Sequence, residues 1–195
     1  MKKVVTPLVL ILNFMFASMA QANVILSLDT APQDAALGDT VSVNLSIDGL
    51  GDGVPLSLSS FDINIAFDTS ALSFAGYNLF DGLGDLSLFE AEDFSLGDLG
   101  GGIANISELS FLTNVDLWAF QPASFTLAEL LFTVDAVPSS SDISVNGAVL
   151  FDTNGDLINV VGVNNTSITA VPAPAISILM GLGLFVLFTR KHSIR

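Results

Sequence analysis

Apolar and polar residues alternate almost strictly along residues 40–47 and 61–67. A period of two is typical of a β-strand that buries one face, because successive side chains point to opposite sides of the strand. No convincing amphipathic helix is apparent, so the pattern predicts an all-β protein, an antiparallel β-sandwich of about nine short strands. The remaining strands are predicted over apolar runs at residues 24–28, 72–77, 103–111, 129–135, 143–151, 157–163 and 167–170.

Turn signals separate these runs, and one of them is also a candidate metal site. Asn154-Gly155 lies between two apolar runs and predicts a hairpin, because both residue types tolerate the positive φ of a tight turn. Asp152, Asn154 and Asp156 also supply oxygens at the first, third and fifth positions of a calcium loop. Leu157 stands where that loop needs a glycine. The hairpin therefore explains this segment better than a structural calcium ion does.

Residues 1–22 have the three parts of a secretory signal peptide. Lys2-Lys3 forms the positive start, the apolar run 4–19 follows, and Ala20 and Ala22 match the small residues of a cleavage site. We therefore expect cleavage after Ala22 and export of the remaining chain. An uncleaved membrane anchor is the alternative interpretation.

Residues 171–195 combine a proline-rich start, an apolar stretch and a basic end. Val171-Pro172-Ala173-Pro174 leads into apolar residues 175–189, close to the ~20 residues with which a helix crosses a bilayer. The tail 190–195 begins with Arg190-Lys191, which the positive-inside rule keeps in the cytoplasm. The segment predicts a transmembrane helix over about residues 175–189, and a permanent anchor is the simplest role for it.

The body between these ends, residues 23–170, is strongly acidic. It contains all 20 Asp and Glu residues and no Lys, Arg or His, and the net charge of the chain is −15. Salt bridges between side chains of the body are therefore impossible, and its surface repels nucleic acid and anionic lipid. Neutral glycans, basic protein patches and divalent cations remain as partners.

The inventory of side chains excludes most catalytic chemistry. The chain has no cysteine, and its single histidine, His192, lies outside the body. Disulfides, thiol and Ser-His mechanisms, and zinc sites built on His and Cys are thereby excluded. A two-carboxylate glycosidase is the one enzyme class that remains, and no motif for it is recognisable. We predict that the protein is not an enzyme and needs no cofactor.

Few residues of the body suggest a ligand site. Sugar binding commonly uses exposed aromatic rings, and the body has one tryptophan, Trp118, and one tyrosine, Tyr77. Either ring is also compatible with the core. The Gly-, Asp- and Leu-rich residues 81–102 are predicted to form a long surface loop, which is either functional or a solvated insertion.

The C-terminal segment resembles the PEP-CTERM sorting signal of Gram-negative bacteria. The resemblance rests on Pro172-Ala173-Pro174, the short apolar helix and Arg190-Lys191, together with a signal peptide at the other end. Ala173 stands in place of the usual glutamate of this family. The resemblance implies transient anchoring in the inner membrane, processing near the prolines by an exosortase-like enzyme, and a final location at the cell surface or outside the cell.

The body resembles cohesin domains in the order of four short motifs. Residues 37–43 are similar to the second strand of a cohesin, residues 61–72 to its strand ending in Y-D-P-S-x-L, residues 130–134 to a later L-x-F-x-V strand, and residues 149–168 to the closing hairpin and last strand. The resemblance implies a nine-stranded jelly-roll related to carbohydrate-binding modules. Well-known cohesins hold dockerin-bearing enzymes on scaffolds, but a shared fold does not carry that function across.

Together these features predict an exported module that binds extracellular polysaccharide or a surface protein. The alternative is a structural role, in which calcium crosslinks the carboxylates of a matrix or biofilm protein. A glycosidase that uses only carboxylates is the third interpretation.

Overall fold

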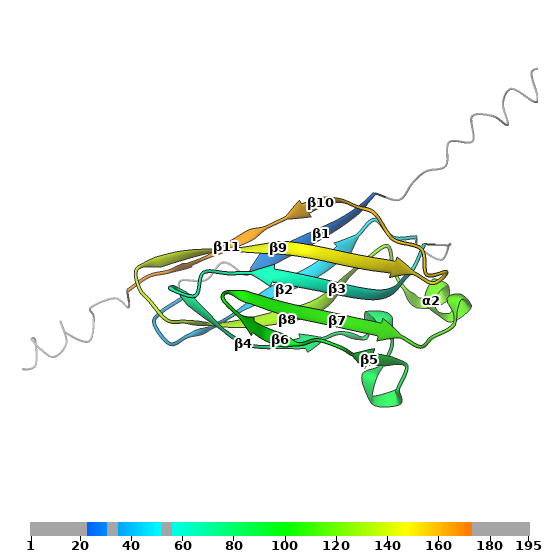
Figure 1. Cartoon of the computed structure of the whole chain (residues 1–195), viewed down its shortest axis with the longest axis horizontal. Helices are drawn as coiled ribbons and strands as arrows, with labels where there is room; N and C mark the ends of the chain where they lie inside the picture. The colour runs from blue at the N-terminus through cyan, green and yellow to red at the C-terminus, as the bar shows by residue number, and fades with distance from the viewer. Residues whose placement is uncertain (1–22, 31–34, 52–55, 173–195) are drawn as a thin grey trace, which may run out of the picture.

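The computed structural model describes residues 23–30, 35–51 and 56–172, which form two packed β-sheets (Figure 1). Three short helical segments lie among the described strands: η1 Asp81–Leu83, η2 Leu86–Leu88 and α2 Asn114–Phe120. The strands within the described residues are β1 Val24–Thr30, β2 Thr40–Asp48, β3 Leu58–Ala66, β4 Leu72–Leu79, β5 Ala91–Asp93, β6 Gly97–Gly100, β7 Ile103–Ser110, β8 Ser124–Val134, β9 Ser139–Asp152, β10 Val160–Asn164 and β11 Thr166–Ala170.

Each sheet joins strands that are distant in the sequence. The first sheet has the order β10-β1-β2-β8-β4, and the second has the order β11-β9-β3-β7-β5, with β6 also paired to β7. The pairing is antiparallel except between β1 and β10, which run parallel. The predicted all-β sandwich is confirmed, and every strand expected from the apolar pattern is present. The expected number of strands was too low, because β5 and β6 are additional.

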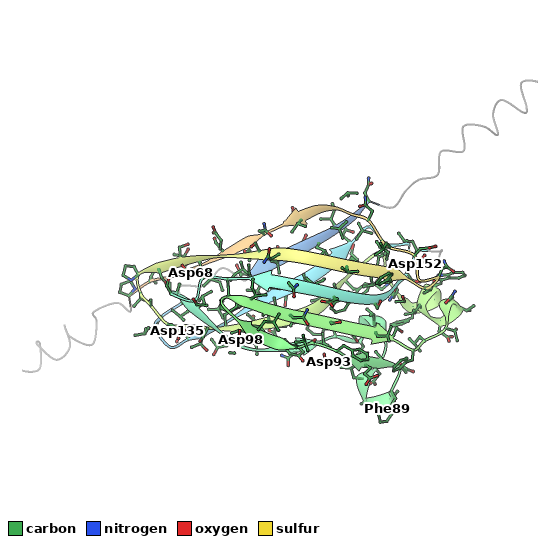
Figure 2. The ribbon with its side chains drawn as sticks, viewed as in Figure 1. Asp68, Phe89, Asp93, Asp98, Asp135 and Asp152 are labelled. Atoms are coloured by element: carbon green, nitrogen blue, oxygen red, sulfur yellow. The ribbon has the colours of Figure 1, made fainter. Side chains whose placement is uncertain are left out.

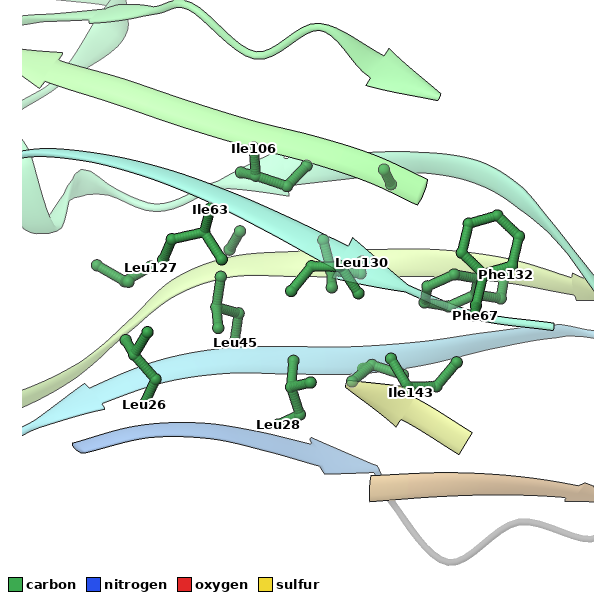
Figure 3. Packing of buried hydrophobic residues seen from close by; sticks show 14 of the residues in the cluster. Leu26, Leu28, Leu45, Ile63, Phe67, Ile106, Leu127, Leu130, Phe132 and Ile143 are labelled. Carbon is green, nitrogen blue, oxygen red and sulfur yellow. The ribbon is translucent and has the colours of Figure 1, made fainter. Parts of the chain in front are cut away.

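The core forms where the alternating strands of the two sheets face each other (Figure 3). In β2, every second side chain from Val41 to Ile47 is buried, and β3 repeats this alternation. The ring of Phe132 in β8 packs edge-on against the ring of Phe67, with the ring centres 5.3 Å apart. Buried apolar surface stabilises a fold by about 25 cal/mol per Å². Apolar packing therefore stabilises a body whose side chains cannot form ion pairs with one another.

Residues 81–102 differ from the long surface loop that the sequence predicts. They include η1, η2, β5 and β6, and both of these strands extend the second sheet by pairing with β7. The prediction was wrong because β5 has three residues and β6 has four, so neither is long enough for a period of two to be visible.

Helix α2 is the second departure from the predicted elements. The hydroxyl oxygen of Thr113 accepts a hydrogen bond from the N–H of Asp116 at 3.3 Å, and the hydroxyl donates to the Asp116 carboxylate at 2.7 Å. Such an N-cap satisfies N–H groups that a helix start leaves free. Leu117 is the single buried residue of α2. A helix of this length with one buried residue lacks the repeating apolar face from which helices are predicted.

Most of the two predicted targeting segments lies outside the described residues. This applies to the signal peptide, residues 1–22, and to the sorting signal from residue 173 onward. Val171 is described, and its N–H donates to the carbonyl of Ala35 at 2.9 Å. In the described part of the chain, no helix is long and apolar enough to cross a membrane.

Candidate binding surface

The outward-facing side chains of β2 and β9 differ in chemistry. On β2, in the first sheet, the side chains between the buried positions are Ser42, Asn44 and Ser46, all of them polar. On β9, in the second sheet, Val149 and Phe151 are exposed by 45% and 36%. Exposed apolar side chains that gather on one face mark contact surfaces. In the first sheet, exposed Val161 and Val163 lie on the edge strand β10, whereas Val149 and Phe151 lie on a strand that has neighbours on both sides. The outer face of the second sheet is therefore the candidate.

The register of the strands places further side chains beside these two. Phe151 of β9 and Leu109 of β7 flank Ser60 of β3, and the next row has the same arrangement around Asp62. Cross-strand partners point to the same face of a sheet, so the two rows form one continuous surface over three neighbouring strands (Figure 1). We call this surface the β9-β3-β7 strip, and its residues are Ser60, Asp62, Ser107, Leu109, Val149 and Phe151.

A polar network fixes the middle of this face. The side-chain amide of Asn105, which is 5% exposed, donates to the carboxylate of Asp62 at 2.7 Å and to the side-chain carbonyl of Asn64 at 3.0 Å. The side-chain oxygen of Asn105 accepts a hydrogen bond from the N–H of Leu96 at 3.1 Å. Hydrogen bonds to a buried amide hold their partners in one geometry. The exposed carboxylate of Asp62 is therefore held in a fixed position beside Val149.

The charge of the strip is negative. Glu92 of β5 lies opposite Leu109 in the register and is exposed, so it adds a second carboxylate at the β5 side of the strip. The body has no basic side chain to neutralise either charge. Apolar area bordered by fixed negative charge suits a protein surface that carries apolar and basic side chains.

The two aromatic residues predicted as ligand contacts lie on different elements. Tyr77 of β4 is half-buried, stacks on Phe74 with the ring centres 6.5 Å apart, and donates its hydroxyl hydrogen bond to Asp93 at 2.8 Å. Burial, and then the hydrogen bond to Asp93, raise the pKa of Tyr77. Trp118 of α2 is also half-buried, and its indole N–H is buried with no acceptor among the described residues. Sugar binding by these rings stays a prediction.

The residues predicted as a weak calcium site form the turn after β9. One carboxylate oxygen of Asp152 accepts hydrogen bonds from the N–H groups of Asn154 and Asp156, each at 2.8 Å. Gly155 has φ +82°, and its N–H donates to the carbonyl of Asp152. The predicted turn is thus confirmed, with the positive φ on Gly155. The strands on its two sides do not form the predicted hairpin, because β9 and β10 lie in different sheets and only the bridge between Phe151 and Leu157 joins the two sides of the turn. Within the described ranges, no group of three His, Cys, Asp or Glu residues is arranged to hold a metal ion.

Sequence reasoning missed one unusual carboxyl group, that of Glu108 in β7. It is 1% exposed, and neither of its oxygens has a hydrogen-bond partner among the described residues. Burial, followed by the charges of Asp93 and Asp81, raises the pKa of Glu108 to about 8. The signal for it was present in the sequence, because Glu108 lies two residues after the buried Ile106 and therefore points to the same side of the strand.

The comparisons identify known structures that share this fold. No family model matches the chain, and no curated protein matches it in sequence. Among solved structures, a type II cohesin domain from the cellulosome of Acetivibrio cellulolyticus is similar with a TM-score of 0.60 and 20% identity, covering 75% of this chain and 95% of that chain.

Two further solved cohesin structures are also similar to this chain. The sixth cohesin of scaffoldin B from Acetivibrio cellulolyticus, solved in complex with a dockerin, has a TM-score of 0.56 and 17% identity over 77% of this chain and 99% of its own. A non-cellulosomal cohesin from the archaeon Archaeoglobus fulgidus has a TM-score of 0.58 and 13% identity over 77% of this chain and 92% of its own. The chain therefore has the fold of cohesin domains.

Proposed function

We propose that this protein is an exported, non-enzymatic module that binds another surface protein through the β9-β3-β7 strip. The observation that carries the proposal is the exposure of Val149 and Phe151 on the outer face of a sheet, next to the fixed carboxylate of Asp62. Phenylalanine side chains are usually buried, so the exposure of Phe151 is best explained by a partner that covers it. The negative charge beside it favours a partner with basic side chains.

The cohesin fold supports a protein partner over a polysaccharide. Solved structures with this fold include complexes of cohesins with dockerins from Acetivibrio cellulolyticus and Clostridium thermocellum. A fold does not fix the partner, so the partner of this chain is defined here by its chemistry: a protein surface with apolar side chains and Lys or Arg.

The location of this binding follows from the two ends of the chain. The signal peptide, residues 1–22, would direct export, and residues 171–195 would hold the protein in the inner membrane until an exosortase-like enzyme processes it near Pro172 and Pro174. The protein would then act at the cell surface or outside the cell. Detection of the C-terminal tail in the mature protein by mass spectrometry would contradict processing at this site.

The test is a binding experiment with the immobilised full chain and envelope proteins of the host. The double variant Val149→Ala/Phe151→Ala should lower capture of the bound protein by about tenfold or more, because truncated contact residues at an interface centre commonly weaken binding to this extent. The matched control is Val161→Ala/Val163→Ala, which truncates two exposed valines of β10 in the first sheet. Equal capture by both double variants would refute the role of the strip.

Two other functions are supported by separate observations. Polysaccharide binding is supported by Trp118, the one tryptophan of the body, because its half-buried ring leaves part of its surface accessible to a sugar. This function predicts that Trp118→Ala abolishes retention on envelope polysaccharide.

A calcium-crosslinked matrix role is favoured by 20 carboxylates in a body without basic residues. It predicts self-association that appears with calcium and is reversed by a chelator, and light scattering that calcium leaves unchanged would exclude it.

A further inference from the structure

A groove lies between helix α2 and the segment that contains η1 and η2. Its volume is about 560 Å³, and apolar side chains of Leu112, Ala119 and Phe120 line it. Carboxylates of Asp81, Asp85, Glu90 and Asp116 line it as well. The groove shares no residue with the β9-β3-β7 strip, so the two surfaces can be altered by separate replacements.

Buried hydrogen bonds hold the two walls of the groove together. The side-chain amide of Gln121, at the end of α2, donates to the carbonyl of Gly82 at 2.9 Å and to the carbonyl of Leu58 at 2.7 Å. The N–H of Leu58 donates back to the side-chain oxygen of Gln121 at 2.8 Å. Phe111 donates its N–H to the carbonyl of Glu90 at 2.7 Å. The groove is therefore a preformed feature, and binding would not have to order its walls.

Large apolar side chains are exposed on the same two segments. Phe80, Leu88 and Phe89 belong to the first segment and Phe120 to α2, and Phe89 is exposed by 84% at the tip of its turn (Figure 2). Phe89 also has φ +60°, a conformation that non-glycine residues rarely adopt. Of these side chains, Phe120 lines the groove itself, and an exposed apolar side chain at a groove is typical of a contact site.

The carboxylates of the groove define what can cover it. The N–H and hydroxyl of Ser87 donate to Asp85, and these hydrogen bonds lower the pKa of Asp85, so its charge is present at neutral pH. The carboxylate of Asp116 is held by the Thr113 hydroxyl. No basic side chain of the body is available to neutralise these charges. A purely apolar partner would leave them desolvated and unpaired, which is unfavourable.

We propose that this groove docks a segment of a partner protein in which a Lys or Arg side chain is flanked by apolar residues. The cation would lie between the carboxylates of Asp81 and Asp116, and its apolar neighbours would cover Phe120 and Leu112. The groove would thus provide a second contact surface, at a different place on the sandwich from the β9-β3-β7 strip.

The test measures binding of a labelled short peptide in which leucine and arginine alternate, by fluorescence anisotropy with the full chain. The variant Asp81→Asn/Asp116→Asn removes two groove charges, and Asp29→Asn/Asp135→Asn removes two exposed charges on other elements as a matched control. We expect the groove variant to weaken binding by about fivefold or more and the control by less than about twofold. Phe120→Ser should weaken binding in the wild-type charge background by a similar factor.

Three outcomes would overturn the proposal. Equal weakening in the groove variant and in the control would show that the peptide responds only to the general negative charge of the body. Equal binding of a peptide in which glutamine replaces arginine would show that no cation is required. Self-association of the full chain that Phe120→Ser abolishes would assign the groove to a second copy of this chain instead.

Discussion

The replacement Glu108→Gln tests how the buried carboxyl group of Glu108 affects the free energy of unfolding. Glu108 points to the inner side of β7, where its carboxyl group has no hydrogen-bond partner among the described residues and faces the charges of Asp93 on β5 and Asp81 on η1. The folded protein therefore keeps this carboxyl group protonated at neutral pH. The unfolded chain does not, because an ordinary glutamate ionises near pH 4.5.

The difference in protonation sets the size and sign of the effect. Between pH 4.5 and about 8, the folded state holds a proton that the unfolded state has released, so the free energy of unfolding falls as pH rises through this window. The slope is about 1.4 kcal/mol per pH unit, which amounts to about 3 kcal/mol between pH 4.5 and pH 7. Glutamine is neutral at every pH, so the variant does not have this fall in the free energy of unfolding. Glu108→Gln should therefore match the wild type below pH 4.5 and exceed its stability by about 3 kcal/mol at pH 7.

Urea denaturation of the full chain at several pH values between 5 and 8 measures this difference. Asp68 and Asp85 do not interfere, because their lowered pKa values place their titration below this window. The matched control is Glu92→Gln, which replaces an exposed carboxylate on β5 and should not reproduce the gain in stability of Glu108→Gln at pH 7. A stability difference between Glu108→Gln and the wild type that stays constant from pH 5 to pH 8 would refute the reasoning.

Two further replacements test how the fold is held together. Gln121→Ala should lower the free energy of unfolding by about 2 kcal/mol, because it leaves buried backbone groups on both sides of the amide without partners. Limited proteolysis should then cut near α2 before the rest of the body, and a uniform cleavage pattern would contradict this role. Gly102→Ala should destabilise by about 2 kcal/mol or more, since Gly102 has φ +80° and a Cβ there would lie 2.3 Å from the carbonyl oxygen of Phe67. Gly101 has φ +65° and open space around it, so Gly101→Ala should lower the melting temperature less than Gly102→Ala does. The reverse order would exclude steric contact as the cause.

The sandwich was predictable because its long strands each bury one face. The alternation in β2 and β3 is visible in the sequence, since polar positions between the buried ones remain in contact with water. The segment 81–102 has no such pattern. Its strands are too short to repeat, and they form because β7 offers an open edge that the sequence does not reveal.

The candidate surface was harder to predict for a different reason. Residues Ala148 to Phe151 are all apolar, so the period of two disappears where β9 contributes to the strip. The register with β3 also shifts between Ile63 and Ile65, which changes which side of the sheet each residue faces. The sequence therefore shows that this run is apolar and leaves open that Val149 and Phe151 point outward.

The parallel pairing of β1 with β10 has a mechanical consequence. In Figure 1, β1 begins at one end of the long axis of the sandwich and β11, which follows β10, ends at the other. A force applied between the two ends of the body would pull β1 along its own axis, while its hydrogen bonds to β2 and β10 run across that axis. These bonds would share the load and break together in shear instead of opening one by one. The first strand of the body is thus held more firmly against a pull along its axis than against one across it.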